Sequence, residues 1–231
     1  MNKKPVKVKK IILILLILCS SKFVFSQKSI VDAPGLYNSF QWNPNVGNSP
    51  IIAPQLWIYS KRRYNVDTVL GIKQQFYFES RYNYEYNNTA SFYFGRSFQH
   101  QTKQTDTLFR EHIIMIGVLG GDTSALSLGY NFSKYNKRFK FETDNQFVYP
   151  LLHPEKKFFF DWTKFTHNIS CDTTFSVGVS WQLQFFTKPI TYIGPMVRLR
   201  LHEWLSIDGF CYYDFIKNQW VYAMALDFEN K

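Results

Sequence analysis

The sequence predicts an all-β protein, an antiparallel transmembrane β-barrel of about 12 strands with 10 as the alternative, behind a cleaved N-terminal signal peptide. Three observations predict it. The N-terminus has the parts of a secretory leader. The chain is 19% aromatic, with 23 Phe, 15 Tyr and 6 Trp, and these residues alternate with small or polar ones at a period of two. After Ile30, no run of ~18 apolar residues offers a transmembrane helix.

Residues 1–26 form the predicted signal peptide. Lysines crowd residues 3–10, a short apolar core covers 11–19, and small or permissive residues precede a cleavage site before Gln27. A membrane anchor would need ~20 apolar residues, about twice the length of this core. A lipid-anchored Cys19 is disfavoured because Leu18 is bulky where lipoprotein processing needs a small residue.

Removing the signal peptide changes the charge of the chain. The full sequence is +10, from 27 basic and 17 acidic residues. Six of the lysines lie within residues 1–26, so the mature chain carries 21 basic and 17 acidic residues, or +4. This mild charge argues against a nucleic-acid partner.

The mature chain is predicted to begin with an irregular lead-in, residues 27–50, in which Pro34, Pro44 and Pro50 stand among several Gly and Asn. Residues 51–231 follow as one domain, the barrel. Eleven strand runs are predicted there, at approximately 53–61, 69–86, 89–99, 111–119, 124–133, 138–149, 157–170, 173–186, 190–201, 204–215 and 220–228. Turn residues such as Asn87-Asn88 separate the runs.

The clearest run is 173–186. One face carries Phe175, Val177, Val179, Trp181, Leu183 and Phe185, and the other carries Ser176, Gly178, Ser180, Gln182 and Gln184. Runs 124–133, 138–149, 190–201 and 220–228 repeat this pattern. Because bacterial barrels have an even number of strands, a twelfth is predicted either near residues 36–42 or by splitting the run 69–86.

The polar face distinguishes a barrel from a soluble secreted β-sandwich, which also alternates. A sandwich exposes Lys, Glu and Thr to water, whereas here the polar face is rich in Gly, Ser, Ala, Asn, Gln and isolated charges of both signs. Such residues suit the crowded interior of a closed barrel. The opposite face would be a very large apolar patch in water, but lipid accepts it.

The stretch ESRYNYEYNNTASFYFGRSF, residues 79–98, shows this alternation with charges among the aromatics. Before the turn, Phe76 and Phe78 are predicted to face lipid, and Glu79 and Arg81 the lumen. After it, Arg96 shares the parity of lipid-facing phenylalanines. The favoured explanation is a β-bulge near Gly95, and the alternative places Arg96 at headgroup level.

The same stretch carries a resemblance. With the pattern Arg81-Tyr82-Asn83-Tyr84-Glu85, then Thr89-Ala90-Ser91, then Gly95, followed by GVLGGDTSALSLGYNFSKYNKRFKFETDNQFVYP, the chain resembles an uncharacterised Bacteroidetes family of outer-membrane proteins from about residue 50 to its end. The resemblance implies an outer-membrane location and a barrel architecture. It implies no established activity and transfers no catalytic residue.

Catalytic and metal motifs are missing from the sequence. The histidines, His100, His112, His153, His167 and His202, are scattered, and neither a G-x-S-x-G nor an H-E-x-x-H motif occurs. His167 with the nearby Ser170 is the best candidate pair for a hydrolase. The pair is better explained as two polar residues at the end of a strand, with no catalytic role. No cofactor is expected. Cys171 and Cys211 remain after signal cleavage, and their spacing does not decide whether they pair.

Charges on the predicted inner face are the functional lead: Glu79, Arg81, Glu85, Lys140, Glu142, Asp144, Arg198, Arg200, Asp208, Asp214 and Asp227. They predict either a salt-bridge network that locks a small barrel or the lining of a narrow water-filled pore.

We therefore expect an outer-membrane barrel of a diderm bacterium, acting as a narrow passive pore or a structural component. A lipid- or lipopolysaccharide-modifying barrel hydrolase and a soluble sandwich are the alternatives. The expected partners are outer-membrane lipid and, during biogenesis, the barrel-assembly machinery.

Overall fold

The computed structural model of the 231-residue chain describes residues 31–42, 51–60, 64–67, 71–83, 89–102, 108–121, 124–169, 174–186 and 189–229. These segments form thirteen β-strands and one short 3₁₀ turn, η1 (Pro154–Lys156). The strands are β1 (Val31–Trp42), β2 (Ile51–Ser60), β3 (Tyr64–Asp67), β4 (Ile72–Asn83), β5 (Thr89–Thr102), β6 (Leu108–Gly120), β7 (Ala125–Tyr135), β8 (Phe139–Pro150), β9 (Phe158–Asn168), β10 (Phe175–Phe186), β11 (Ile190–His202), β12 (Leu205–Asp214) and β13 (Gln219–Glu229).

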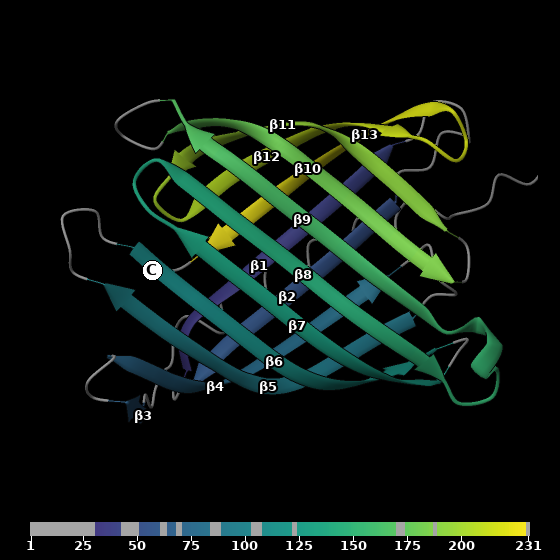
Figure 1. Ribbon diagram of the computed structural model, residues 1–231, viewed down its shortest axis with the longest axis horizontal. Helices are drawn as coiled ribbons and strands as arrows, with labels where there is room; N and C mark the ends of the chain where they lie inside the picture. Colours follow the sequence, from purple (N-terminus) through teal and green to yellow (C-terminus); the bar gives the residue numbers. More distant parts are fainter. Residues whose placement is uncertain are drawn as a thin grey trace, which may run out of the picture.

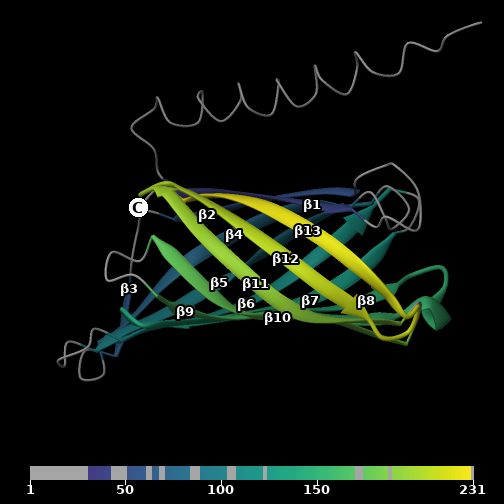
Figure 2. The ribbon, with the colours of Figure 1, turned by 90° about the horizontal axis from the view of Figure 1, so that it is seen from above.

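The strands form one antiparallel sheet that closes into a tube (Figure 1; Figure 2). From β4 to β13 each strand pairs with the next in sequence, and β1 pairs with both β13 and β2. β2 bypasses the short β3 and pairs with β4, with Gln55 opposite Arg81. The short β3 pairs only with β4 and is not part of the closed ring. The other twelve strands of the described segments form the ring. The prediction of 12 strands is confirmed.

The lead-in predicted as irregular is wrong for residues 31–42, which form β1. Residues 27–30 and 43–50 lie outside the described residues. The barrel therefore begins at Val31 and not at residue 51. Without β1, β2 and β13 would each have an unpaired edge, and a closed ladder satisfies those backbone groups. Of the two sources predicted for a twelfth strand, the region near 36–42 is the right one, with Leu36 opposite Phe228.

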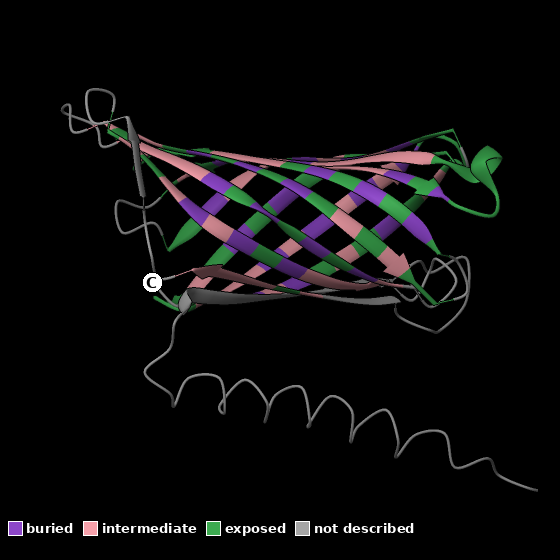
Figure 3. Cartoon of the chain, turned by 90° about the horizontal axis from the view of Figure 1, so that it is seen from below, coloured by how far each residue is buried: buried purple, intermediate pink, exposed green. Residues whose placement is uncertain are grey.

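Side chains alternate between the two faces of the ring, as the period of two predicts (Figure 3). In β6, Glu111, Ile113 and Met115 are buried inside, whereas Ile114 and Ile116 on the outer face are exposed. The outer faces of the other strands are likewise apolar, with Phe94, Leu128, Phe165, Val179, Val197 and Met224 all exposed. The described wall thus presents a mainly apolar surface outward and encloses polar and aromatic side chains.

The bulge predicted near Gly95 is wrong. Pairing of β4 with β5 runs from Ile72 opposite His100 to Asn83 opposite Thr89 without a register shift. Arg96 consequently lies on the outer face, where its guanidinium covers the Phe76 ring at 4.7 Å from the centroid.

The neighbouring Gln74 extends this arrangement. With the Gln74 amide turned so that its oxygen faces Arg96, it accepts a hydrogen bond from the Arg96 Nε at 3.2 Å. Gln74 is the third residue of β4, so the long arginine side chain is directed toward one end of the barrel. This is the headgroup-level alternative, in which a charge on an apolar wall reaches toward water.

Connections at the end of the barrel that carries η1 are short. They span residues 43–50, 84–88, 121–124, 151–157, 187–189 and 215–218. The barrel has no long segment at this end that could form a large ligand-gripping surface. In the described residues, no helix has both the length and the apolar character to cross a membrane.

Candidate luminal site

Nine of the predicted luminal charges lie on the inner face of the barrel, as strand register and burial show. They are Glu79, Arg81, Lys140, Glu142, Asp144, Arg198, Asp208, Asp214 and Asp227. Arg200 has the same parity on β11. Glu85 lies outside the described residues. Two inward charges, Glu111 and Lys164, were not among the predicted set.

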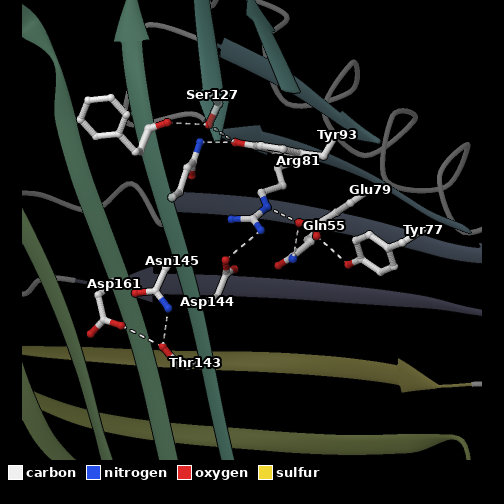
Figure 4. A network of polar contacts seen from close by, with 12 residues as sticks. Gln55, Tyr77, Glu79, Arg81, Tyr93, Ser127, Thr143, Asp144, Asn145 and Asp161 are labelled. Atoms are coloured by element: carbon white, nitrogen blue, oxygen red, sulfur yellow. Dashed lines mark hydrogen bonds and ion pairs between the residues drawn. The ribbon is translucent and has the colours of Figure 1, made fainter. Parts of the chain in front are cut away.

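The first half of the site surrounds Glu79, which is fully buried. Its carboxylate accepts hydrogen bonds from the Gln55 Nε2 at 2.5 Å, the Tyr77 hydroxyl at 2.6 Å and the Arg81 Nε (Figure 4). The other end of the Arg81 guanidinium, Nη2, reaches the Asp144 Oδ1 at 2.9 Å. Because β4 and β8 are four strands apart in the ring, this ion pair crosses the interior.

The second half is centred on Arg198 of β11. Its Nε and Nη2 donate to the two oxygens of Asp208 at 2.6 and 2.7 Å, a bidentate pair between strands in register. Nη2 also lies 3.5 Å from the Glu142 Oε2, three strands away. Lys140 and Lys164 bind the same Glu142 carboxylate at 2.9 and 3.6 Å.

Strand β8 joins the two halves, because Glu142 and Asp144 are two residues apart on its inner face. The result is a line of alternating charges from β4 through β8 to β12. We call it the charge belt: Glu79, Arg81, Lys140, Glu142, Asp144, Lys164, Arg198 and Asp208.

Burial divides the belt into sealed and accessible charges. The side chains of Glu79 and Asp208 are 0% exposed. Those of Asp144, Lys140 and Glu142 are 20, 22 and 25% exposed, and these three lie together on β8. Solvent inside the barrel therefore reaches the belt along the inner face of β8. Glu79 and Asp208, the acids at the two ends of the belt, are out of its reach.

Aromatic and sulfur-containing side chains fill the lumen on either side of the belt. One cluster comprises Tyr192, Met196, Phe210, Tyr212, Val221 and Ala225, and the other Tyr77, Tyr93, Ile113 and Met115. Buried hydroxyls are satisfied within them: the Ser180 hydroxyl accepts a hydrogen bond from the Trp162 Nε1 at 3.1 Å and pairs with the Tyr212 hydroxyl at 2.9 Å.

Asp214 has a different role from the one expected of a lining charge. It is 1% exposed, and its Oδ1 accepts hydrogen bonds from the backbone N–H groups of Ile216 and Lys217. It therefore closes the turn between β12 and β13. Asp227 is buried at 6% exposure, so the access to solvent expected of a pore-lining acid is small there too.

Comparison with known proteins was informative only at the level of structure. No known family's sequence profile matches the chain, and no curated protein matches it. Among solved structures, it is similar to the KdgM porin, with 6% identity and a TM-score of 0.50, over 85% of this chain and 99% of that chain. It is also similar to the KdgM porin in complex with disordered oligogalacturonate, with 6% identity and a TM-score of 0.50, over 87% and 100%.

The chain has the outer-membrane β-barrel fold. The apolar outer wall is thus the lipid-facing surface. A further similarity, to outer membrane phospholipase A from Escherichia coli, has 11% identity and a TM-score of 0.48, over 85% of this chain and 92% of that chain. A likeness at that level carries no argument about activity.

The candidate hydrolase residues are not brought together in the described part of the barrel. His167 lies on the outer face, 4.9 Å from the Phe139 ring, and Ser170 is outside the described residues. The described contacts of the other histidines are with Tyr130, Phe132, Glu155 and Trp204, so none touches a serine or threonine hydroxyl there. No described group of three His, Cys, Asp or Glu residues is arranged to hold a metal ion. Cys211 is a free thiol, and Cys171 lies outside the described residues.

Proposed function

We propose that the protein is a narrow passive pore in the outer membrane of a diderm bacterium, with the charge belt as its constriction. The observation that carries the proposal is the division of the belt. Glu142, Asp144 and Lys140 keep a fifth to a quarter of their side-chain surface exposed inside the barrel, and Glu142 and Asp144 do so away from the ends of β8. A belt that served only to lock the barrel would seal all of its members, as it seals Glu79 and Asp208.

The accessible charges define the solutes. Arg81 reaches Asp144 across the interior, and Lys140 and Lys164 bind Glu142 on the same side of the lumen. Charges of both signs at a constriction favour small hydrated ions and small polar solutes, because an apolar molecule would have to displace their water. The neighbouring KdgM porins support a pore on this fold, and the lipid-facing wall supports residence in lipid. The barrel-assembly machinery would insert the barrel into the membrane. The resemblance to a Bacteroidetes family favours a bacterium of that group as the source of the protein.

Planar-bilayer conductance of the refolded mature chain, residues 27–231, tests the proposal. We expect discrete, voltage-stable steps. Replacing the two accessible acids, E142Q/D144N, should shift the reversal potential in a salt gradient toward anion preference. The opposite change, K140Q/K164Q, should shift it toward cation preference. The matched control is R138Q, because Arg138 is exposed in the β7–β8 turn outside the lumen.

Folding must be established before silence is interpreted. A barrel that migrates as folded on unheated SDS gels and shows strand-type circular dichroism, yet conducts nothing, contradicts the pore. That result would favour the second candidate, a structural barrel whose belt and aromatic clusters form a plug. The fully buried Glu79, Asp208 and Tyr212 are the observation that favours this candidate.

A further inference from the structure

A polar patch interrupts the lipid-facing wall at the middle of the barrel. It consists of Thr143 and Asn145 of β8, Asp161 and Thr163 of β9, and Trp181 of β10, and we call it the wall patch. The register places Asn145 opposite Asp161, Thr143 opposite Thr163, and Thr163 opposite Trp181, without a shift. All five residues have the parity of exposed Phe139, Tyr149, Phe165 and Val179, so they lie on the outer face.

The five side chains form one hydrogen-bonded group. Asp161 accepts from the Trp181 Nε1 at 2.8 Å through Oδ2, and from the Thr143 and Thr163 hydroxyls at 2.9 Å through Oδ1. Asn145 donates one N–H to the Thr143 hydroxyl at 2.9 Å. Figure 4 shows three members of this group: Asn145 and Asp161 meet at Thr143, whereas the neighbouring Asp144 reaches Arg81.

This group is incomplete in a lipid environment. Asp161 has no basic partner in the described residues, and its three hydrogen bonds leave one of about four carboxylate lone-pair positions open. Asn145 keeps its second N–H and its carbonyl oxygen without a partner there. Hydrocarbon offers no hydrogen bonds, so each open group is unfavourable, and an ionisable residue at this depth indicates a functional contact.

We propose that two copies of this chain associate through the wall patch, about a two-fold axis parallel to the barrel axis. The Asn145 amide of each copy donates to the Asp161 carboxylate of the other. A two-fold interface requires a surface that complements itself, so that the contact of one residue with another is repeated in reverse. Here the open donor and the open acceptor lie on adjacent strands, opposite each other in register.

The chemistry of the patch favours a second copy over a basic segment of another protein. A lysine or arginine would satisfy Asp161 but would leave the Asn145 N–H without an acceptor. A copy of the patch satisfies both groups at once. Lipid is as apolar as the surrounding phenylalanines, so burying apolar surface gives little drive for association within a membrane. Polar contacts between the two copies would supply that drive. The proposal does not rest on the pore, because the patch and the belt occupy opposite faces of β8.

Cysteine cross-linking in lipid vesicles tests the contact. In the full mature chain carrying C171S and C211S, F147C should be joined to its copy by a short bismaleimide cross-linker. Phe147 is the next outer-face residue of β8 after Asn145, and its replacement leaves Asn145 and Asp161 in place. The matched control is M224C, at an exposed outer position on β13, elsewhere on the wall. It should cross-link only at background level. Equal cross-linking at the two positions, or none at either, would overturn the proposal.

A residue swap tests the chemistry with the natural cysteines in place. In detergent, sedimentation should show a dimer for the natural chain. N145D places two carboxylates against two others and should raise the dimer dissociation constant about ten- to a hundredfold, the loss of two intramembrane hydrogen bonds. The double variant N145D/D161N restores a donor opposite an acceptor and should recover the dimer. Folding of each variant is checked on unheated SDS gels.

Failure of the folded double variant to recover the dimer would overturn the pairing. The proposal would also be overturned if the natural chain sedimented as a monomer at every protein concentration and the F147C variant were cross-linked to a different protein in intact outer membranes. That result would assign the patch to another partner.

Discussion

Removing Arg198 should destabilise the barrel strongly, and removing its partner as well should largely reverse the loss. Arg198 binds both oxygens of Asp208, at 2.6 and 2.7 Å, and Asp208 has no solvent-exposed surface. In R198Q this carboxylate stays buried without its guanidinium. Two buried hydrogen bonds to a charged group correspond to about 3–6 kcal/mol, and breaking a buried ion pair on one side typically costs about 3–5 kcal/mol.

The double variant R198Q/D208N replaces the ion pair by two neutral amides of similar size. We expect it to lose roughly 1 kcal/mol, because no buried charge remains unpaired. The double variant should therefore be about 2–4 kcal/mol more stable than R198Q. Glu142, the other carboxylate near Arg198, still has Lys140 and Lys164 in both variants, so its contribution cancels in the comparison.

Urea unfolding in detergent, followed by tryptophan fluorescence, measures the free energy of unfolding of R198Q, D208N and the double variant. The exposed turn variant R138Q should stay within about 0.5 kcal/mol of the natural chain. If R198Q lost less than about 1 kcal/mol, or if the double variant lost as much as the sum of R198Q and D208N, the belt would not be a stabilising ion-pair network.

Three further predictions concern the wall and its packing. G194A should abolish refolding to the heat-modifiable form on SDS gels, because a Cβ there meets the backbone of the neighbouring strand, whereas G120A, with open space around it, should refold normally. R96L should be neutral or slightly stabilising in urea unfolding, but L128R, on the lipid-facing wall, should lose about 2–4 kcal/mol. S180V should lose about 1–3 kcal/mol by the same assay, because the buried Tyr212 hydroxyl and the half-buried Trp162 Nε1–H each lose a hydrogen-bond partner.

The sequence predicted the faces of most strands, because a period of two assigns each residue to one side once a few aromatics are placed. It thereby predicted that Glu79, Arg81 and Asp144 face inward. It could not predict that Arg81 binds Asp144, because the two are 63 residues apart and meet only across a closed ring. Such contacts depend on the ring size and the register of every intervening strand.

The misses have separate physical causes. Lys164 lies in FFFDWTKF, where aromatics occupy both faces and the phase is unreadable without pairing partners. The outward position of Asp161 was missed for the same reason, because it lies in the same stretch. The bulge at Gly95 rested on the assumption that arginine must point inward, but its long side chain can lie along an apolar wall. β1 was missed because Pro34 and Gly35 indicate irregular backbone, and the register shift between Asp32 and Gly35 accommodates them.

The pairing of β1 with β13 has a consequence for how the protein is made. Gly35 lies opposite Glu229, so this contact closes a loop of 194 residues (229 minus 35). The chain entropy of such a closure is about 4.7 kcal/mol plus a constant, from (3/2)RT ln n, against about 2.7 kcal/mol for a twenty-residue hairpin. The eleven other pairings of the ring join strands that are neighbours in sequence, so they can form early and locally, but the seam forms last. A nascent chain that still lacks the eleven residues of β13 has no partner for the free edges of β1 and β12. Export of the chain must therefore be complete before a closed barrel can enter the bilayer.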